Sequence, residues 1–172
     1  MTKMAARKSG AGGARARLRR HKPGDLGWII YRHSALYAKE YGWDGSFEAL
    51  VADIAASFIR NYDPEYERCW IAELDGEMVG SVVLVRKSKT VAQLRLLLVE
   101  PKARGIGLGT RLVRSCERFA RRAGYRKIML WTNDVLHAAR HIYEGAGYRL
   151  VREEPHYSFG HKLVGQFWEL KL

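Results

Sequence analysis

Three alternate glycines, Gly105, Gly107 and Gly109, stand between an apolar run and a helical pattern. The run from Leu94 to Val99 ends before Pro101, whose missing N–H stops sheet pairing, so the sequence predicts a strand, a turn and a helix start. Glycines leave backbone N–H groups accessible, and the unpaired N–H groups and dipole at a helix start favour an anion. The spacing therefore predicts a phosphate-binding loop.

The spacing also separates the kinds of phosphate loop. A P-loop needs a lysine before its Ser or Thr, whereas Thr110 follows Gly109 directly. A dinucleotide fingerprint would place its third glycine at Thr110 and would follow a strand without the intervening residues 101–104. A tight turn without a ligand is a third interpretation. The pattern Arg-x-x-Gly-x-Gly fits Arg104 to Gly109 without adjustment and resembles the acyl-CoA signature of the GCN5-related N-acetyltransferase (GNAT) family.

A second motif lies downstream, in the expected order. Residues 137–148 resemble the family's helix that contains alanines, carries a tyrosine and ends at Gly-Phe or Gly-Tyr; here the tyrosine is Tyr143 and the end is Gly147-Tyr148. More narrowly, residues 27–172 resemble the acetyltransferase domain that follows a MarR-type winged-helix regulator in some bacterial proteins.

This resemblance implies transfer of an acetyl group from acetyl-CoA to a primary amine of a small molecule or protein, by direct attack in a ternary complex. In the family, the central strand bends outward near its end and its backbone groups bond the cofactor. That role falls here to Leu97, Leu98 and Val99. The resemblance assigns the pyrophosphate to a loop in which Arg104 adds charge, made of Arg104, Gly105, Ile106, Gly107, Leu108, Gly109 and Thr110.

Tyr143 stands where the family places the general acid that protonates the departing thiolate and contacts the cofactor. A tyrosine pKa of about 10 keeps the hydroxyl protonated at neutral pH, as an acid requires. The alternative is a buried aromatic residue on a core stripe. Family members often have an asparagine seven residues before the tyrosine, but Leu136 occupies that position. Asn133 is the candidate to contact the cofactor instead.

The acceptor is expected between the first two helices, the central strand and the link before the last strand. Tyr41, Trp43, Arg95 and His156 are predicted to bind it, and aromatic walls suit an apolar or ring-bearing amine. Further candidate wall residues are Tyr37, Phe47 and Phe159. No base is assigned, because the candidates that could act through water also fit solvated surface positions: Glu40, Glu73, Glu100, His33 and His156.

The composition is that of one domain with a basic tail. With 172 residues and 47% hydrophobic residues, the chain can bury a core. Residues 1–22 hold eight Lys or Arg and no acid, within a net charge of +12. Residues 1–13 are predicted to be a disordered basic tail or linker, and 14–172 the acetyltransferase domain. The tail could touch nucleic acid through phosphates, but it has no recognisable reading module, which argues against that partner.

No run of about 18 apolar residues and no signal-peptide pattern is present, so we expect a cytoplasmic protein without a membrane partner. Cys69 and Cys116 make neither a disulfide framework nor a metal site and are expected to be buried free thiols. No metal is predicted, and a homodimer is left open.

Periodicity predicts strands at 15–21, 68–74, 78–85, 91–99, 127–132, 148–153 and 164–171, with helices at 25–41, 45–61, 107–124 and 136–146. Residues 155–162 read as a polar link. This order is that of the GNAT fold, which implies a mixed, mostly antiparallel sheet of six or seven strands with about four helices on both faces. The alternative function is a non-catalytic module that senses acetyl-CoA and regulates a partner.

Overall fold

The structure, a computed structural model, describes residues 15–172; the predicted tail at 1–13 lies outside the described residues. A seven-stranded sheet has the order β1-β2-β3-β4-β5-β7-β6. The strands are β1 (Arg17–Arg20), β2 (Arg68–Leu74), β3 (Glu77–Arg86), β4 (Val91–Val99), β5 (Lys127–Asn133), β6 (Arg149–Ser158) and β7 (His161–Lys171). The helices are α1 (Asp25–Tyr41), α2 (Gly45–Asn61), the 3₁₀ turn η1 (Pro101–Ala103), α3 (Leu108–Arg122) and α4 (His137–Gly145). The predicted element order and mixed sheet are confirmed.

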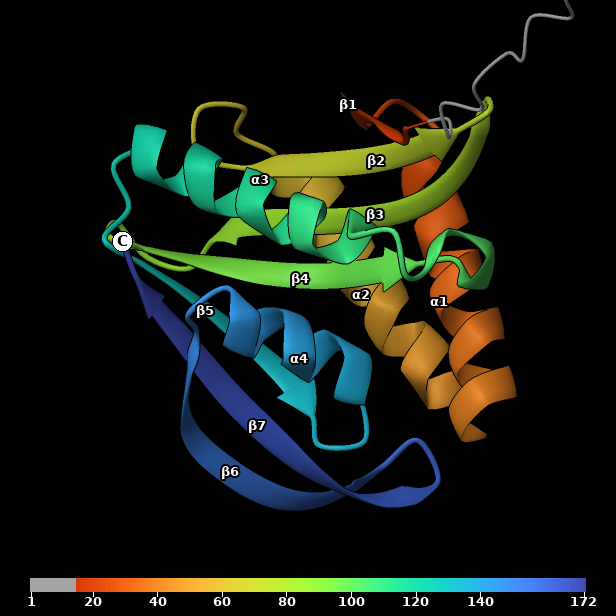
Figure 1. The fold of residues 1–172 in the computed structure, drawn as a ribbon. Coiled ribbons are helices and arrows are strands. Elements are labelled where there is room, and N and C mark those ends of the chain that lie inside the picture. Colours follow the sequence, from red (N-terminus) through yellow and green to blue (C-terminus); the bar gives the residue numbers. More distant parts are fainter. Residues whose placement is uncertain (1–14) are drawn as a thin grey trace, which may run out of the picture.

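Helices cover both faces of this sheet (Figure 1). On one face, α3 and α4 pack over a core that includes Leu112 and Ile128. On the other, α1 and α2 bury Ile29 and Phe58 against Val83 of β3. Each such side chain contributes about 1.5–3 kcal/mol when fully buried. The two cores hold the middle strands in place, and β4 lies between them.

The turn between α1 and α2 directs aromatic residues inward. Gly42 ends α1 in the left-handed conformation, with φ of 69°. Two residues later Asp44 caps α2, its carboxylate accepting the Ser46 N–H at 2.9 Å. Trp43 is thereby only 4% exposed, with its ring centroid 4.8 Å from that of Phe47. The turn places this aromatic pair beside the end of the sheet.

The prediction of a polar link over 155–162 is wrong. Instead β6 and β7 form a hairpin, and Pro155 pairs opposite Val164. The hairpin turns at Phe159 and Gly160, whose φ values of 58° and 82° suit a two-residue turn. Because β6 is the edge strand, proline is tolerated there, since its missing N–H can face the open side.

The two cysteines are buried and free, as predicted. Burial raises the pKa of Cys69 to about 12 and raises that of Cys116 well above its usual value, so both thiols stay protonated and inert. Within residues 15–172, no helix is long and apolar enough to cross a membrane.

Candidate active site

The site begins where β4 and β5 part. These parallel strands pair only from Val91 to Gln93, opposite Lys127 to Met129. The antiparallel pairing of β4 with β3 continues to Val99, opposite Gly80. Figure 1 shows the two strands diverging beyond their short paired region. The second half of β4 therefore borders a gap on the β5 side.

A bulge turns β4 at the start of this gap. Ser81 of β3 lies opposite Leu98, whereas Val83 lies opposite Arg95, so two residues of β4 face the single residue between them. Leu96 takes up the irregularity with φ of 52°, a left-handed conformation that is rare for leucine. The Ser81 hydroxyl donates to the Leu96 carbonyl at 3.2 Å. This bond stabilises the bulge, which the family resemblance places near the end of the strand.

The glycine loop follows β4 and η1. Gly105 and Gly107 have φ of 78° and 76°, and a Cβ at either position would meet no atom within 4 Å. Their backbone conformation, rather than crowding, therefore requires glycine. Gly107 is the N-cap of α3 and provides no side-chain cap, so the first N–H groups of that helix are free of a capping side chain. Such a helix start favours an anionic group.

Gly109 has a different function in the loop. A Cβ there would lie 2.5 Å from Ile142 Cδ1 and 3.7 Å from Val99 Cγ2. Glycine thus allows the first turn of α3 to approach α4 closely. The three alternate glycines therefore serve two physical purposes, and only at Gly109 would a Cβ crowd a neighbouring side chain, that of Ile142.

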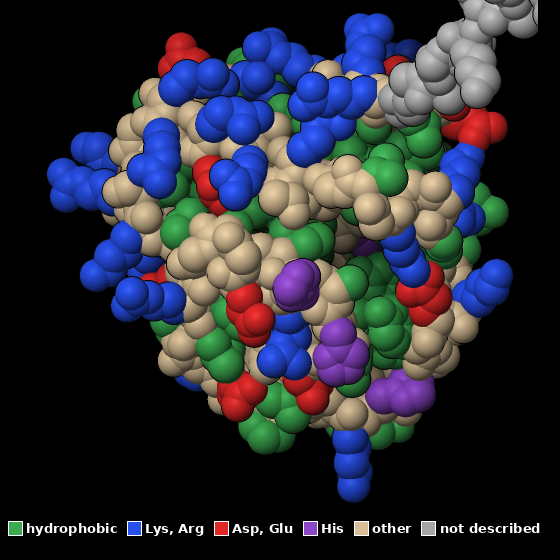
Figure 2. Space-filling model, viewed as in Figure 1, with side chains coloured by type: hydrophobic (Ala, Val, Ile, Leu, Met, Phe, Trp, Pro, Cys, Tyr) green, Lys and Arg blue, Asp and Glu red, His purple; other side chains and the backbone are tan. Residues whose placement is uncertain are grey.

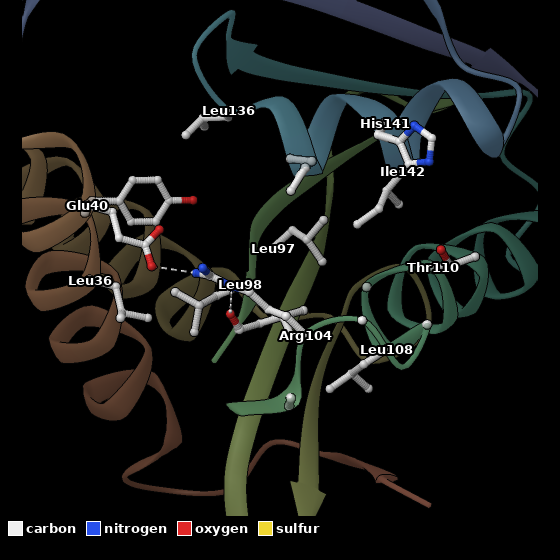
Figure 3. A pocket seen from close by; sticks show the side chains of 18 of the residues that line it. Leu36, Glu40, Leu97, Leu98, Arg104, Leu108, Thr110, Leu136, His141 and Ile142 are labelled. Atoms are coloured by element: carbon white, nitrogen blue, oxygen red, sulfur yellow. Dashed lines mark hydrogen bonds and ion pairs between the residues drawn. The ribbon is translucent and has the colours of Figure 1, made fainter. Parts of the chain in front are cut away.

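Between α1, β4, the glycine loop and α4 lies a cavity of about 430 Å³, here called the first cavity. Figure 3 shows Leu97 reaching into it from β4, with Thr110 on α3 and Ile142 on α4 beyond. In the space-filling view, hydrophobic side chains line a hollow near the middle of this face, below a surface rich in Lys and Arg over α3 (Figure 2). Its predicted cofactor residues are Leu97, Leu98, Val99, Arg104, Gly105, Gly107, Leu108, Gly109 and Thr110.

Arg104 bridges the first cavity rather than pointing freely into it. Its guanidinium donates to Glu40 Oε1 on α1 at 2.8 Å and to the Val99 carbonyl at 3.3 Å. Figure 3 shows this link between helix and loop. The side chains of Arg104 and Glu40 are 48% and 27% exposed, so solvent weakens the ion pair. Arg104 is thus already partnered in the structure.

A smaller cavity of about 110 Å³, the second cavity, adjoins the first. It lies on the α2 side of the gap, with aromatic walls that include Trp43, Phe47 and Trp131. The two cavities share four lining residues, namely Tyr37, Leu97, Leu136 and Ala139. A group at Leu97 can therefore be approached from both sides.

Tyr143 lines the second cavity and not the first. It is 4% exposed, and its ring centroid lies 5.8 Å from that of Tyr148. Burial raises the pKa of Tyr143 well above its usual value, so its hydroxyl stays protonated at any physiological pH. It stands one helical turn from Ala139, which borders both cavities.

Asn133 also lines the second cavity, but its side chain is already engaged. His156 lines neither cavity; its Nε2 lies 2.8 Å from Asn133 Oδ1, and its Nδ1 lies 2.9 Å from Ser158 Oγ. The His156 ring is also 5.5 Å from that of Trp131. The structure thus places His156 behind the cavity wall, where it positions other side chains.

The remaining acceptor candidates divide between the cavities. Trp43 and Arg95 line the second cavity, whereas Tyr41 lines the first. Phe159 lines neither and packs on Trp43 at a centroid distance of 4.8 Å. Ile106, predicted to contact the cofactor, lines neither cavity, and its side chain is 56% exposed.

Most of the candidate general bases already form ion pairs or hydrogen bonds within the protein. Glu73 pairs with Arg19, and Glu100 pairs with Arg32. His33 is buried and its Nδ1 lies 2.8 Å from a backbone carbonyl in its own helix. Among these candidates only Glu40 borders the first or the second cavity, and it pairs with Arg104. The geometry supplies no side-chain base next to Leu97 within residues 15–172.

Several lining residues carry no sequence signal of their own. Trp131 on β5, Ile142 on α4 and Leu36 on α1 reach the cavities from separate elements. The helical and strand periodicity could place each on an inward face, but not beside another. The pairing of β5, the packing of α4 on α3 and the packing of α1 against β4 bring them together.

The first cavity fits the acyl-CoA that the sequence predicts. The loop from Gly105 to Gly107 has open space where side chains would stand, and it leads into an uncapped helix start suited to a pyrophosphate. Leu97 and Leu98 offer apolar contact for the pantetheine arm of acyl-CoA. The gap between β4 and β5 leaves backbone groups of β4 available to hydrogen-bond that arm.

Comparison with known proteins agrees with this geometry. The model of the acetyltransferase (GNAT) family matches residues 30–148. N-acetylaspartate synthetase of Danio rerio is 33% identical over 116 residues, which make up 67% of this chain and 40% of that protein. N-acetyltransferase family 8 member 7 of Mus musculus is 29% identical over 128 residues, covering 70% of this chain and 56% of that protein. The chain spans about half the length of these curated relatives.

Solved structures show the same fold at low identity. The structure of yncA from Salmonella typhimurium with acetyl-CoA superposes with a TM-score of 0.72 at 17% identity, covering 92% of this chain and 95% of that one. An N-acetyltransferase from Staphylococcus aureus Mu50 gives a TM-score of 0.74 at 18% identity, covering 92% and 99%. The chain therefore belongs to the acetyltransferase (GNAT) family.

Proposed function

We propose that the domain, over residues 14–172, transfers an acetyl group from acetyl-CoA to a primary amine bound in the second cavity, by direct attack in a ternary complex. The observation that carries this proposal is the junction of the two cavities at Leu97, within the bulge of β4. A donor in the first cavity and an amine in the second would meet there. Holding both in place supplies much of the rate acceleration.

The first cavity would hold acetyl-CoA, which supplies an acetyl group already activated as a thioester. Backbone N–H groups from Gly105 to Thr110 would bind its pyrophosphate at the start of α3. The backbone of Leu97 to Val99, which β5 does not pair, would orient the acyl end and polarise its carbonyl. These roles use main-chain groups, which hold their positions without reorganisation.

Tyr143 would hold the proton that the leaving sulfur needs. When the amine nitrogen bonds to the acetyl carbon and the C–S bond breaks, the Tyr143 hydroxyl would protonate the sulfur, and the tyrosinate would regain a proton through water. Burial raises the pKa of Tyr143, which keeps its proton in place until the sulfur departs. The amine must lose a proton as well. No carboxylate or imidazole lines the second cavity within the described residues, so that proton would leave through water.

A module that binds acetyl-CoA without turnover is the alternative from the sequence. Two features support turnover instead: a second cavity joined to the first, and a buried hydroxyl in its wall. A sensing module needs only the first cavity. The matches to N-acetyltransferases favour the same interpretation.

The test is release of CoA thiol by the full chain with acetyl-CoA and a panel of primary amines and peptides, beside calorimetric titration with acetyl-CoA. We expect binding and amine-dependent release. Binding without release by any amine would support the sensing module, and no heat at millimolar acetyl-CoA would contradict both interpretations. A cytoplasmic location, a homodimer and a bacterial origin with a relationship to MarR-type regulators stay predictions from the sequence.

A further inference from the structure

Arg95 is the charged residue of the second cavity. Every other lining residue is apolar, aromatic or neutral and polar. It stands on β4 one residue before the left-handed Leu96 and two before Leu97, where the cavities join. Its side chain is half-buried among aromatic walls, so its charge is partly removed from water. Burial alone lowers the pKa of Arg95, with no contribution from a neighbouring charge.

Two other partly buried arginines, Arg19 and Arg32, pair with carboxylates. Arg19 lies 2.6 Å from Asp25, and the Arg32 guanidinium donates to Glu100 Oε2 at 2.9 Å. Within residues 15–172, Arg95 makes no ion pair, hydrogen bond or cation–π contact that meets ordinary distance criteria. A half-buried guanidinium costs desolvation energy unless something compensates it. The fold leaves this one available to a ligand.

We propose that Arg95 binds a carboxylate of the acceptor, so that the acceptor class is an amino acid rather than a plain amine or a protein amine. This inference rests on the proposed function. A guanidinium presents two parallel N–H donors that match the two oxygens of a carboxylate. An unpaired positive charge in the same cavity disfavours a simple ammonium ion, whereas a carboxylate cancels it.

The position of Arg95 fits the reaction geometry of an amino acid. A carboxylate at Arg95 fixes one end of the acceptor, and the amine one carbon away is then directed along β4 toward Leu97. The side chain of the acceptor would face Trp43, Phe47 and Trp131, which suits aromatic or aliphatic groups. A protein N-terminus carries an amide, and a lysine side chain a methylene, where a free amino acid carries the carboxylate that Arg95 would bind.

The experiment uses matched acceptor sets: phenylalanine, phenylalaninamide and 2-phenylethylamine, with the corresponding leucine set. We expect the wild type to acetylate the free acid at least about tenfold more efficiently in kcat/KM than its amide or amine. Arg95→Met should lower kcat/KM for the acid about tenfold to a hundredfold, the effect of losing a hydrogen bond to a charged group, and change the other two by less than about threefold. Arg95→Lys, which keeps the charge but loses the fork, should recover part of the loss.

Arg114→Met is the matched control, because Arg114 is exposed on α3 and lines neither cavity. It should leave all three rates unchanged. Equal use of acid and amide by the wild type would overturn the proposal while leaving acetyl transfer intact. An equal loss for all three acceptors in Arg95→Met, with acetyl-CoA binding reduced as well, would also overturn it, since that pattern marks a structural role.

A second measurement does not require turnover. Protein saturated with CoA is titrated calorimetrically with N-acetylphenylalanine and with its amide. We expect the acid to bind the wild type, the amide to bind at least about tenfold more weakly, and Arg95→Met to bind both alike. A wild type that binds CoA but does not distinguish acid from amide contradicts the carboxylate site. A wild type that does not bind CoA instead contradicts the proposed function.

Discussion

The two cavities are built by different means. The proposed phosphate end of the first cavity is made of backbone: two left-handed glycines and an uncapped helix start, beside a strand end that β5 does not pair. The second is made of side chains that converge from α1, α2, β4, β5 and α4. They share four lining residues, of which Leu97 lies on β4 within the bulge.

This difference assigns acetyl-CoA binding to the first cavity and the choice of acceptor to the second. A backbone cradle recognises what all acyl-CoA molecules share, and mutation of exposed side chains changes it little. A side-chain cavity can vary residue by residue without disturbing the cradle. We therefore expect substitutions in the first cavity to change acetyl-CoA affinity, and substitutions in the second to change turnover and acceptor choice.

The largest expected effect comes from the second cavity. Tyr143→Phe removes only the proposed acid and should lower turnover about a hundredfold, the scale of one positioned proton donor, with acetyl-CoA affinity within about twofold. Turnover comes from thiol release at saturating substrate and affinity from calorimetry. Tyr148→Phe is the control: Tyr148 is 3% exposed and adjacent, its hydroxyl has no hydrogen-bond partner among the described residues, and it lines neither cavity. Equal losses in both variants would assign Tyr143 to packing.

In the first cavity, Gly109→Val should weaken acetyl-CoA binding about tenfold to a hundredfold. A Cβ at this position already lies 2.5 Å from Ile142 Cδ1, so the larger side chain must displace the Ile142 side chain, which lines the first cavity, and fill part of that cavity. Calorimetry gives the affinity, and circular dichroism shows whether the fold persists. Gly27→Val is the matched control in the first turn of α1, where a Cβ meets nothing within 4 Å. An unchanged affinity of Gly109→Val for acetyl-CoA would contradict the assignment of the first cavity as the donor site.

The sequence predicts the first cavity better than the second, because the glycine loop is one contiguous segment whereas the second cavity draws on side chains from separate elements. The glycine loop is contiguous, so the sequence alone assigns Arg104 to Thr110 to one site. The strand alternation and helical periodicity predict the seven strands and four α-helices in order, because each is a local pattern, but they do not predict η1. The hairpin of β6 and β7 was missed because Pro155 and the histidines suggest a loop, and only the edge position of β6 permits a proline there.

The second cavity could be predicted only in part. Trp43 and Arg95 were named, but Trp131 was not, because nothing in β5 itself indicates that it faces α2 across the gap. Partners were also hidden: the sequence does not show that Arg104 pairs with Glu40, 64 residues away, or that His156 bonds Asn133, 23 residues away. Such contacts depend on tertiary packing, which local patterns do not encode.

His33 packs behind Tyr37, a residue that lines both cavities, and its protonation should affect stability. Burial lowers the pKa of His33 to about 4, and its ring stacks on Tyr37 at a centroid distance of 5.8 Å. An unfolded histidine has a pKa of about 6.5, so below that pH the unfolded chain binds a proton that the folded chain does not. Stability should therefore be unaffected above pH 6.5 and fall by at most about 1.4 kcal/mol per pH unit toward pH 4.

Urea unfolding at pH 7.5, 6.0 and 5.0 measures this dependence. His33→Gln removes the titrating group and should flatten the acid slope, whatever its stability at pH 7.5. The exposed His137 provides the control, since His137→Gln should keep the wild-type slope. If the unfolding free energy of His33→Gln falls with pH as steeply as that of the wild type, groups other than His33 govern acid unfolding.

The smallest effect tests whether any side chain tunes the backbone cradle. Glu40→Gln removes a carboxylate beside the anion site and releases Arg104, so acetyl-CoA should bind about twofold to fivefold more tightly at low salt, the range of an exposed ion pair. Raising the salt to about 0.5 M should abolish the difference, because exposed charges are screened. Glu77→Gln, which breaks the exposed pair with Lys102 outside both cavities, should have no effect. Weaker binding in Glu40→Gln would mean that Glu40 positions Arg104 for the cofactor, and that the first cavity depends on side chains after all.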